Sequence, residues 1–236
     1  MTTAELPAHD LVDVRLSDAF SLGGCPVCVV RARSERAALD SIIAEHVLDI
    51  PFRADLERKR GFCRRHTREL IAADRRGSGG ILGSSILYGA MLERRLELIR
   101  GVVGSKRRSR KTRLDLSRKR PPCLACEQGV SAVEVALGRL VQRAGTPGWA
   151  DVIADAAYCV DDLLALWAVA ADDVPFEPIA RRQLARLEDL RTRLDGFVDH
   201  SAHDRRHLQT DHEAKAAREA AEALGGSVAT ADRSDG

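Results

Sequence analysis

The six cysteines of this chain form two copies of one pattern, in which a third cysteine follows a CxxC pair after more than thirty residues. Three residues beyond the third cysteine stands a histidine in the first copy and an aspartate in the second. Three thiolates and an imidazole make a closed tetrahedral site for zinc. The repeat therefore predicts two metal sites, the first formed by Cys25, Cys28, Cys63 and His66 and the second by Cys123, Cys126, Cys159 and Asp162.

The two predicted sites differ in their fourth ligand. Carboxylate oxygen can bind zinc, but thiolate sulfur and imidazole nitrogen are the usual ligands of structural zinc sites. We therefore expect the site with Asp162 to hold its ion more weakly than the site with His66. An open ligand position is typical of a catalytic metal, so a metal-dependent enzyme is the alternative to a structural role.

Zinc itself has alternatives. Cysteine and histidine ligands also hold iron–sulfur clusters, and the ligand spacing does not separate the two, although cluster ligands are mostly all cysteine. Zinc-bound thiolates that are exposed can oxidise, so a redox-responsive protein is a further alternative. Structural disulfides are not expected, because the first residues lack the basic and apolar regions of a signal peptide. No apolar run approaches 18 residues, so we expect a cytoplasmic protein without membrane association.

The residues around the ligands indicate helices, and the expected fold class is all-α. Asp49 before Pro51 is typical of a helix N-cap with proline in the first turn. Cys63 and His66 stand one helical turn apart, so both can face one ion if a helix begins there. A turn is expected at 74–80, and apolar spacing predicts helices at 81–100, 126–143, 149–156, 160–170, 176–200 and 203–224.

These elements suggest two helical pseudo-repeats, each clipped by one metal, followed by a long C-terminal helical hairpin. Hydrophobic residues make up 44% of the chain but aromatic residues only 4%, so a metal clip would add much to such a core. The expected segments are an N-terminal arm at 1–19, the first Cys3His repeat at 20–101, a basic linker at 102–122, the degraded Cys3Asp repeat at 123–174, the C-terminal helices at 175–224 and a disordered tail at 225–236.

The linker contains the strongest charge cluster of the chain. Residues 106–120 hold nine basic residues and one acid, a local charge of +8 in a chain of net charge +2. Phosphate contacts need no particular fold, so weak, salt-sensitive nucleic-acid binding is another alternative. Against it, the segment has no aromatic residue for base stacking. The candidate residues are Lys106, Arg107, Arg108, Arg110, Lys111, Arg113, Arg118, Lys119 and Arg120.

The run from Cys25-Pro-Val-Cys28 to Gly61-Phe62-Cys63-Arg-Arg-His66 resembles an uncharacterised bacterial family of cysteine-rich helical proteins. Members of that family have duplicated CPxC…GFCxxH halves and a later aromatic-basic segment, which falls here on 197–206. The resemblance covers most of residues 20–222. It implies the helical fold and the metal sites, but no established activity.

The chain contains no P-loop, GxGxxG or G-x-S-x-G motif that would indicate a nucleotide-binding or hydrolytic enzyme. The sequence therefore predicts a zinc-binding helical scaffold or interaction module with a protein partner. An enzyme, redox or iron–sulfur role and a nucleic-acid role are the alternatives.

Overall fold

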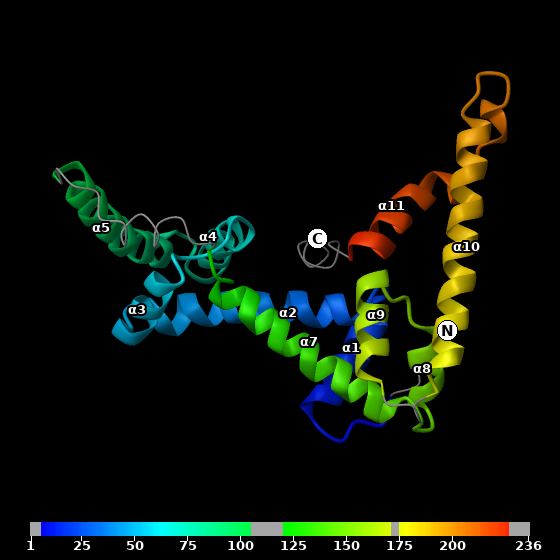
Figure 1. Cartoon of the computed structure of the whole chain (residues 1–236), viewed down its shortest axis with the longest axis horizontal. Coiled ribbons are helices and arrows are strands. Elements are labelled where there is room, and N and C mark those ends of the chain that lie inside the picture. Colours follow the sequence, from blue (N-terminus) through cyan, green and yellow to red (C-terminus); the bar gives the residue numbers. More distant parts are fainter. Residues whose placement is uncertain (1–5, 105–119, 171–174, 227–236) are drawn as a thin grey trace. The chain divides into compact units, whose positions relative to one another are not determined.

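A computed structural model describes residues 6–104, 120–170 and 175–226 of the chain. Within these ranges every regular element is a helix, and the fold class is all-α as expected (Figure 1). No helix in the described residues is long and apolar enough to cross a membrane. Residues 105–119 of the expected basic linker at 102–122 lie outside the described ranges.

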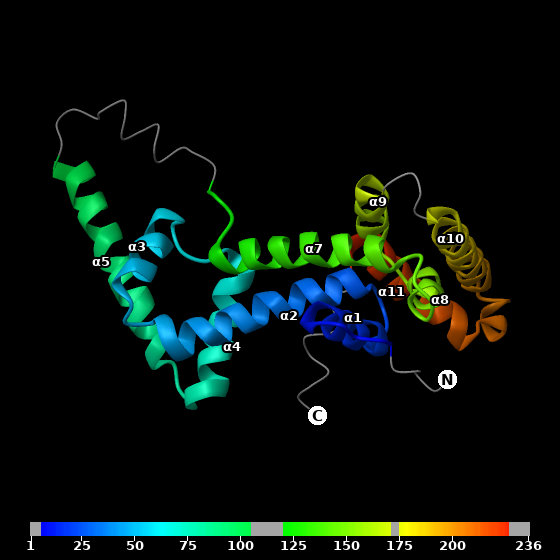
Figure 2. The ribbon, with the colours of Figure 1, turned by 90° about the horizontal axis from the view of Figure 1, so that it is seen from below.

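The first helix, α1 (Leu11–Leu22), covers much of the segment that was expected as an N-terminal arm. Asp10 caps the helix, because its side chain accepts hydrogen bonds from the backbone N–H groups of Val12 and Asp13. Leu16 and Ala19 are fully buried, so α1 is part of the core. The helix lies beside the first turns of the next helix along the chain (Figures 1 and 2).

The next helices follow the predicted order. The helix α2 (Pro26–Ser41) continues into a short π-helix (Ile42–His46) and is followed by α3 (Ile50–Arg58). Asp49 caps α3 as predicted, accepting a 3.2 Å hydrogen bond from the backbone N–H of Phe52. The helices α4 (Arg64–Ser78) and α5 (Leu82–Gly104) complete this part of the chain.

The turn predicted from residue 74 starts later than expected, because α4 continues to Ser78. Asp74 is buried in the helix and accepts a 2.6 Å hydrogen bond from the backbone N–H of Ser84, so it holds the start of α5 instead of forming a turn. The chain reverses at Gly79, whose φ of 72° is the left-handed conformation that favours glycine.

The remaining helices are α7 (Leu124–Arg143), α8 (Trp149–Asp155), α9 (Val160–Val169), α10 (Phe176–His200) and α11 (Asp211–Gly225). Four of them match the predicted ranges within two residues. The helix expected from 203 begins only at Asp211, after a short 3₁₀ turn at Arg206–Leu208. Thr210 and Glu213 form a capping box that fixes this start.

The chain divides into two compact units. The central unit is Ser34–Val130, and the terminal unit combines Met1–Arg33 with Ser131–Gly236. Each unit has its own apolar core, that of the terminal unit around Leu16, Trp149 and Tyr158 and that of the central unit around Leu39 and Leu70. These units differ from the predicted succession of two repeats, because two helices belong to both units. The helix α2 begins in the terminal unit and ends in the central unit, and α7 begins in the central unit and ends in the terminal unit.

Candidate metal centres

All eight predicted ligands come together in two groups of four, but the grouping differs from the expected one. In each group the candidate ligand atoms lie within 4.8 Å of one another. The Cys3His cluster, in the central unit, consists of Cys63, His66, Cys123 and Cys126, and the Cys3Asp cluster, in the terminal unit, consists of Cys25, Cys28, Cys159 and Asp162. The expected pairing of each CxxC with the third cysteine of its own half is therefore wrong.

The helices that follow the two CxxC pairs explain why each pair groups with the third cysteine of the other half. Cys28 lies at the start of α2, whose 16 residues span about 24 Å and end in the central unit, which contains Cys63. Cys126 lies at the start of α7, whose 20 residues span about 30 Å and end in the terminal unit, which contains Cys159. Each third cysteine therefore meets the CxxC of the other copy.

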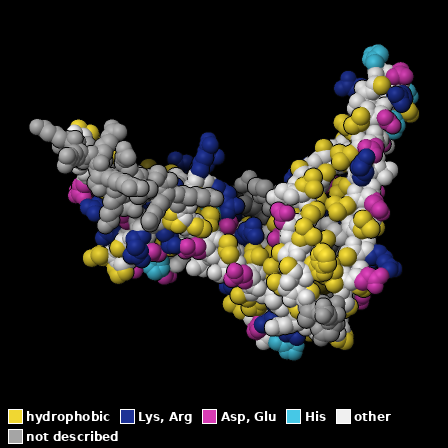
Figure 3. All heavy atoms as spheres, viewed as in Figure 1, with side chains coloured by type: hydrophobic (Ala, Val, Ile, Leu, Met, Phe, Trp, Pro, Cys, Tyr) yellow, Lys and Arg dark blue, Asp and Glu magenta, His cyan; other side chains and the backbone are white. Residues whose placement is uncertain are grey.

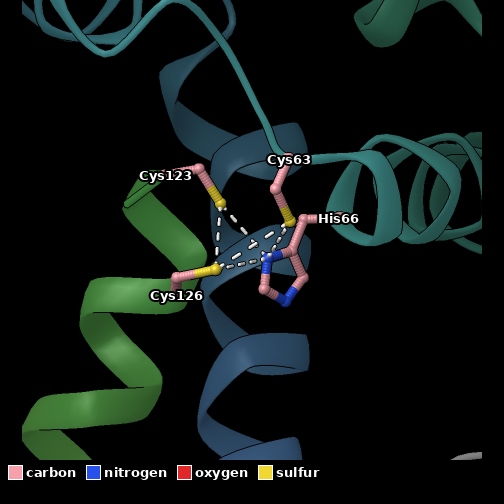
Figure 4. Close-up of side chains that lie close together, drawn as sticks. All are labelled: Cys63, His66, Cys123 and Cys126. Carbon is pink, nitrogen blue, oxygen red and sulfur yellow. Dashed lines mark hydrogen bonds between the residues drawn. The ribbon is translucent and has the colours of Figure 1, made fainter. Parts of the chain in front are cut away.

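The Cys3His cluster is built on two helix starts (Figure 4). Cys63 is the N-cap residue of α4 and His66 lies in the first turn of that helix, while Cys123 and Cys126 flank the start of α7. Nδ1 of His66 lies 3.3 Å from Sγ of Cys63, 3.2 Å from Sγ of Cys123 and 3.3 Å from Sγ of Cys126. Helix N-termini favour anionic thiolates, so the backbone supports the charge that metal binding requires.

The sulfur–sulfur distances match a single tetrahedral ion. Sγ of Cys126 lies 3.6 Å from Sγ of Cys123 and 3.9 Å from Sγ of Cys63. The edge of a tetrahedron is about 1.6 times its centre-to-corner distance, so zinc–sulfur bonds of about 2.3 Å place sulfur atoms about 3.8 Å apart. The four atoms thus already have the spacing of a coordination shell.

The electrostatics of the cluster favour a cation at its centre. Burial by itself would lower the pKa of His66, but hydrogen bonds to Cys123 and Glu35 raise it to about 10. Burial opposes ionisation of Cys123, yet His66 and nearby backbone N–H groups lower the pKa of this thiol to about 6. Burial and the neighbouring Cys123 raise the pKa of Cys126 to about 12. A proton on His66 thus offsets the charge of one thiolate, and a divalent metal ion would displace that proton and offset the charge of two.

The loop before α4 is held in place by Arg120. This guanidinium donates to the backbone carbonyl of Arg60 at 2.7 Å and also to that of Phe62. Arg120 is the one described member of the predicted basic segment, and it contacts the protein backbone next to the Cys3His cluster. The other eight predicted nucleic-acid contacts lie outside the described residues.

The Cys3Asp cluster has the same layout in the terminal unit. Cys159 is the N-cap residue of α9, Asp162 lies in its first turn, and Cys25 and Cys28 flank the start of α2. Oδ2 of Asp162 accepts hydrogen bonds from Sγ of Cys25 at 3.2 Å, of Cys28 at 3.1 Å and of Cys159 at 3.2 Å. Sγ of Cys28 lies 3.7 Å from Sγ of Cys159, again close to the edge expected for zinc.

The ligands of this second cluster can carry more negative charge than those of the Cys3His cluster. Four ligands that can each become anionic converge here, and NH2 of Arg31 lies 3.9 Å from Oδ1 of Asp162. Burial raises the pKa of Asp162, and hydrogen bonding to Cys159 raises the pKa of Cys25 to about 12. The cluster therefore ionises fully only when a cation is bound.

Residues 8–140, which are more than half of the chain, match the family of unknown function DUF6062. The chain belongs to this family. The matched range of this DUF6062 protein contains every residue of the Cys3His cluster, together with Cys25 and Cys28, and ends before Cys159 and Asp162. The expectation of a family without an assigned activity is confirmed. Neither the curated proteins nor the solved structures that were searched contain a match.

Proposed function

We propose that this protein is a zinc-binding helical scaffold in which each cluster holds one structural ion. The observation that carries the proposal is the convergence of eight side chains from four separate segments into two groups with near-tetrahedral spacing. Such an arrangement is assembled only by folding, so the free energy of metal binding contributes to the stability of the fold.

Zinc is favoured over an iron–sulfur cluster by the sulfur–sulfur distances. These distances are 3.6, 3.7 and 3.9 Å, which suit one ion about 2.3 Å from each sulfur. An iron–sulfur cluster places several irons and sulfides between its cysteine ligands, which would hold the cysteine sulfurs much farther apart. Each cluster has space for a single ion only.

A structural role is favoured over a catalytic one by the number and burial of the ligands. Both clusters supply four protein ligands, whereas catalytic zinc sites usually supply three and leave one position open. Asp162 is 4% exposed and Cys25 only 2%. The cavity beside the Cys3Asp cluster, lined by Tyr158, Arg186 and Glu219 among others, has a volume of about 40 Å³, far below that of ordinary ligand sites.

We also propose that this protein binds a protein partner in the cytoplasm. Apolar side chains gather on the surface over α9 and α10 (Figure 3), and Trp167 is 62% exposed there while its ring stacks on Phe176. Leu164, Val169 and Leu184 are also more than half exposed. Exposed apolar surface of this kind is typical of interaction sites, which supports the role of an interaction module.

Elemental analysis of the purified chain, together with its visible spectrum, tests the proposal. Two zinc ions per chain and no visible absorption are the expected result. Iron with sulfide and a visible absorption band would replace the zinc scaffold with an iron–sulfur protein. Protein that folds fully without any metal would remove the structural role.

Nucleic-acid binding remains a second candidate because of the distribution of charge. The stretch Ser34–Val130 holds 22 basic and 12 acidic residues, a net charge of +10, whereas the rest of the chain holds 15 basic and 23 acidic residues, a net charge of −8. A basic central unit suits phosphate contacts. Binding to DNA or RNA should be detectable at about 50 mM salt and fall steeply by about 200 mM. A variant lacking 106–119 should lose it, and intact protein that fails to bind at the lower salt would exclude this candidate.

A further inference from the structure

Glu35 is a buried acid on α2, a helix that supplies no ligand to the Cys3His cluster. Its side chain is 6% exposed, and its Oε2 lies 3.4 Å from Nε2 of His66, the ring nitrogen that does not face the thiols. A second carboxylate, that of Glu69, lies 3.6 Å from the same nitrogen, but its side chain is 44% exposed. A buried carboxylate is costly unless it is paired, so Glu35 is held at His66 by specific partners.

One partner is Arg65, whose NH2 donates to Oε2 of Glu35. The same guanidinium lies 2.7 Å from Nε2 of His66, which is a hydrogen bond only when the ring proton is on Nδ1. An ion bound through Nδ1 leaves no proton on that nitrogen, so the ring of a metal-bound His66 carries its proton on Nε2. In that tautomer both Nε2 and Arg65 donate towards the carboxylate of Glu35.

The helix α7 leaves space for Glu35 at Gly129. A Cβ atom at this position would lie 2.5 Å from Oε1, 2.7 Å from Cγ and 2.8 Å from Cδ of Glu35, closer than real Cβ atoms approach other atoms. Beside it, Oγ of Ser34 donates a 3.2 Å hydrogen bond to the carbonyl of Gln128, so α2 and α7 lie close together at this level. Glycine in a helix costs about 1 kcal/mol relative to alanine, and here it permits the close approach of the acid.

A histidine that binds metal commonly donates its other N–H to a carboxylate. That bond fixes the tautomer and the ring orientation and makes the imidazole a stronger ligand. We propose that Glu35 is the positioning residue of the Cys3His site, and that Gly129 is required in α7 because it admits Glu35. This inference rests on the proposed zinc function and assigns to α2 a part in a site whose ligands all come from elsewhere.

The test compares zinc affinity in full-length variants by competition with a chelator. Alkylation of individual cysteines reports which cluster has released its ion. Glu35→Gln keeps the size of the side chain but removes its charge, and should weaken zinc at the Cys3His cluster about 10- to 100-fold, as outer carboxylates do at other sites. The matched control Glu69→Gln, at a similar distance but exposed, should change the affinity less than about threefold. The Cys3Asp cluster should be unaffected in both variants.

Gly129→Ala should weaken the same site, because the added methyl group displaces Glu35. In the double variant Glu35→Gln/Gly129→Ala the losses should be much less than additive, since the second change acts through a carboxylate that is already neutral. In zinc-loaded wild type, nitrogen-15 spectra should show the His66 proton on Nε2, and this signal should shift in Glu35→Gln. Such a shift distinguishes positioning of the ring from general destabilisation.

The outcomes separate this inference from the function on which it rests. Wild type that binds no zinc at the Cys3His cluster would contradict the proposed function. Wild type that binds zinc normally, with Glu35→Gln unchanged in affinity and in the His66 signal, would overturn the role of Glu35 alone.

Discussion

Sγ of Cys28 lies 3.7 Å from Sγ of Cys159, although 131 residues separate them in the chain. The corresponding pair in the other cluster, Cys126 and Cys63, is separated by 63 residues. One cluster is therefore nested inside the sequence span of the other. Each ion would join the start of a long helix to a segment from the opposite half of the sequence.

This grouping predicts which thiols are released when one ligand is lost. Cys63→Ser should open the Cys3His cluster, so that Cys123 and Cys126 react with an alkylating reagent while Cys25, Cys28 and Cys159 stay protected by their ion. Metal content should fall from two ions to one, and the central unit should lose stability because metal binding and folding are coupled. Mass spectrometry of alkylated peptides gives the answer. Reaction at Cys25 and Cys28 in place of Cys123 and Cys126 would restore the pairing within each half.

The residues that form the two clusters could be predicted from the sequence, whereas their grouping could not be read from their spacing. The sequence contains the same motifs whether a CxxC pair forms a cluster with the CxxH or CxxD of its own half or with that of the other half. The informative signal was the length of the helices after each CxxC, since 16 and 20 helical residues carry the chain far from its first pair. Asp49 as an N-cap and most helix ranges were predicted for the same local reason, because caps and apolar periodicity act within a few residues.

Features that depend on tertiary contacts were missed. Asp74 was expected to begin a turn but is buried in a helix, where it binds the backbone of Ser84. Glu35 belongs to no sequence motif, and only its distances to His66 and to the Cβ position of Gly129 reveal its role. Local sequence does not contain such information, since it arises when two helices approach each other.

The two clusters should differ in metal affinity. In a zinc site with three thiolates, a carboxylate oxygen is a less usual fourth ligand than an imidazole nitrogen. The ligands of the Cys3Asp cluster can also carry one more negative charge than those of the Cys3His cluster. A chelator titration should therefore expose Cys25, Cys28 and Cys159 to alkylation before the cysteines of the other cluster. Asp162→Asn, which removes the ligand charge, should release this ion at still lower chelator concentration. Simultaneous release from both clusters in wild type would contradict the expected order.

Gly61 should be hard to replace. Its φ of 85° lies in the region that side chains rarely adopt, and an added Cβ would collide with the methyl group of Met91. Gly61→Ala should lower the free energy of unfolding by at least about 1 kcal/mol, the cost of a left-handed residue. Gly89→Ala is the control in the same unit, since nothing lies within 4 Å of its Cβ position and alanine should stabilise the helix by about 0.5–1 kcal/mol. Equal effects of both changes in denaturant unfolding would refute the argument.

Asp13 should stabilise the terminal unit by an amount that does not change over the neutral range of pH. This fully buried carboxylate is bound by Arg139 at 2.8 Å and Arg143 at 2.5 Å. Burial by itself would raise the pKa of Asp13, but these guanidinium groups and the backbone N–H of His9 lower it to about 2 from an ordinary value of 3.8. Because the folded-state pKa is the lower one, the stabilisation is fully present above pH 3.8 and is lost as the pH falls towards 2.

The shift corresponds to about 2 kcal/mol, so Asp13→Asn should lower the free energy of unfolding by at least that amount at neutral pH. Denaturant unfolding of wild type and Asp13→Asn at about pH 5.5 and 8 measures the difference while the carboxylate stays ionised in both the folded and the unfolded chain. The difference between the two proteins should be the same at both values, because the carboxylate of Asp13 stays ionised at both. A difference that grows or shrinks strongly between them would show that another titrating group, and not the ion pairs of Asp13, determines the effect.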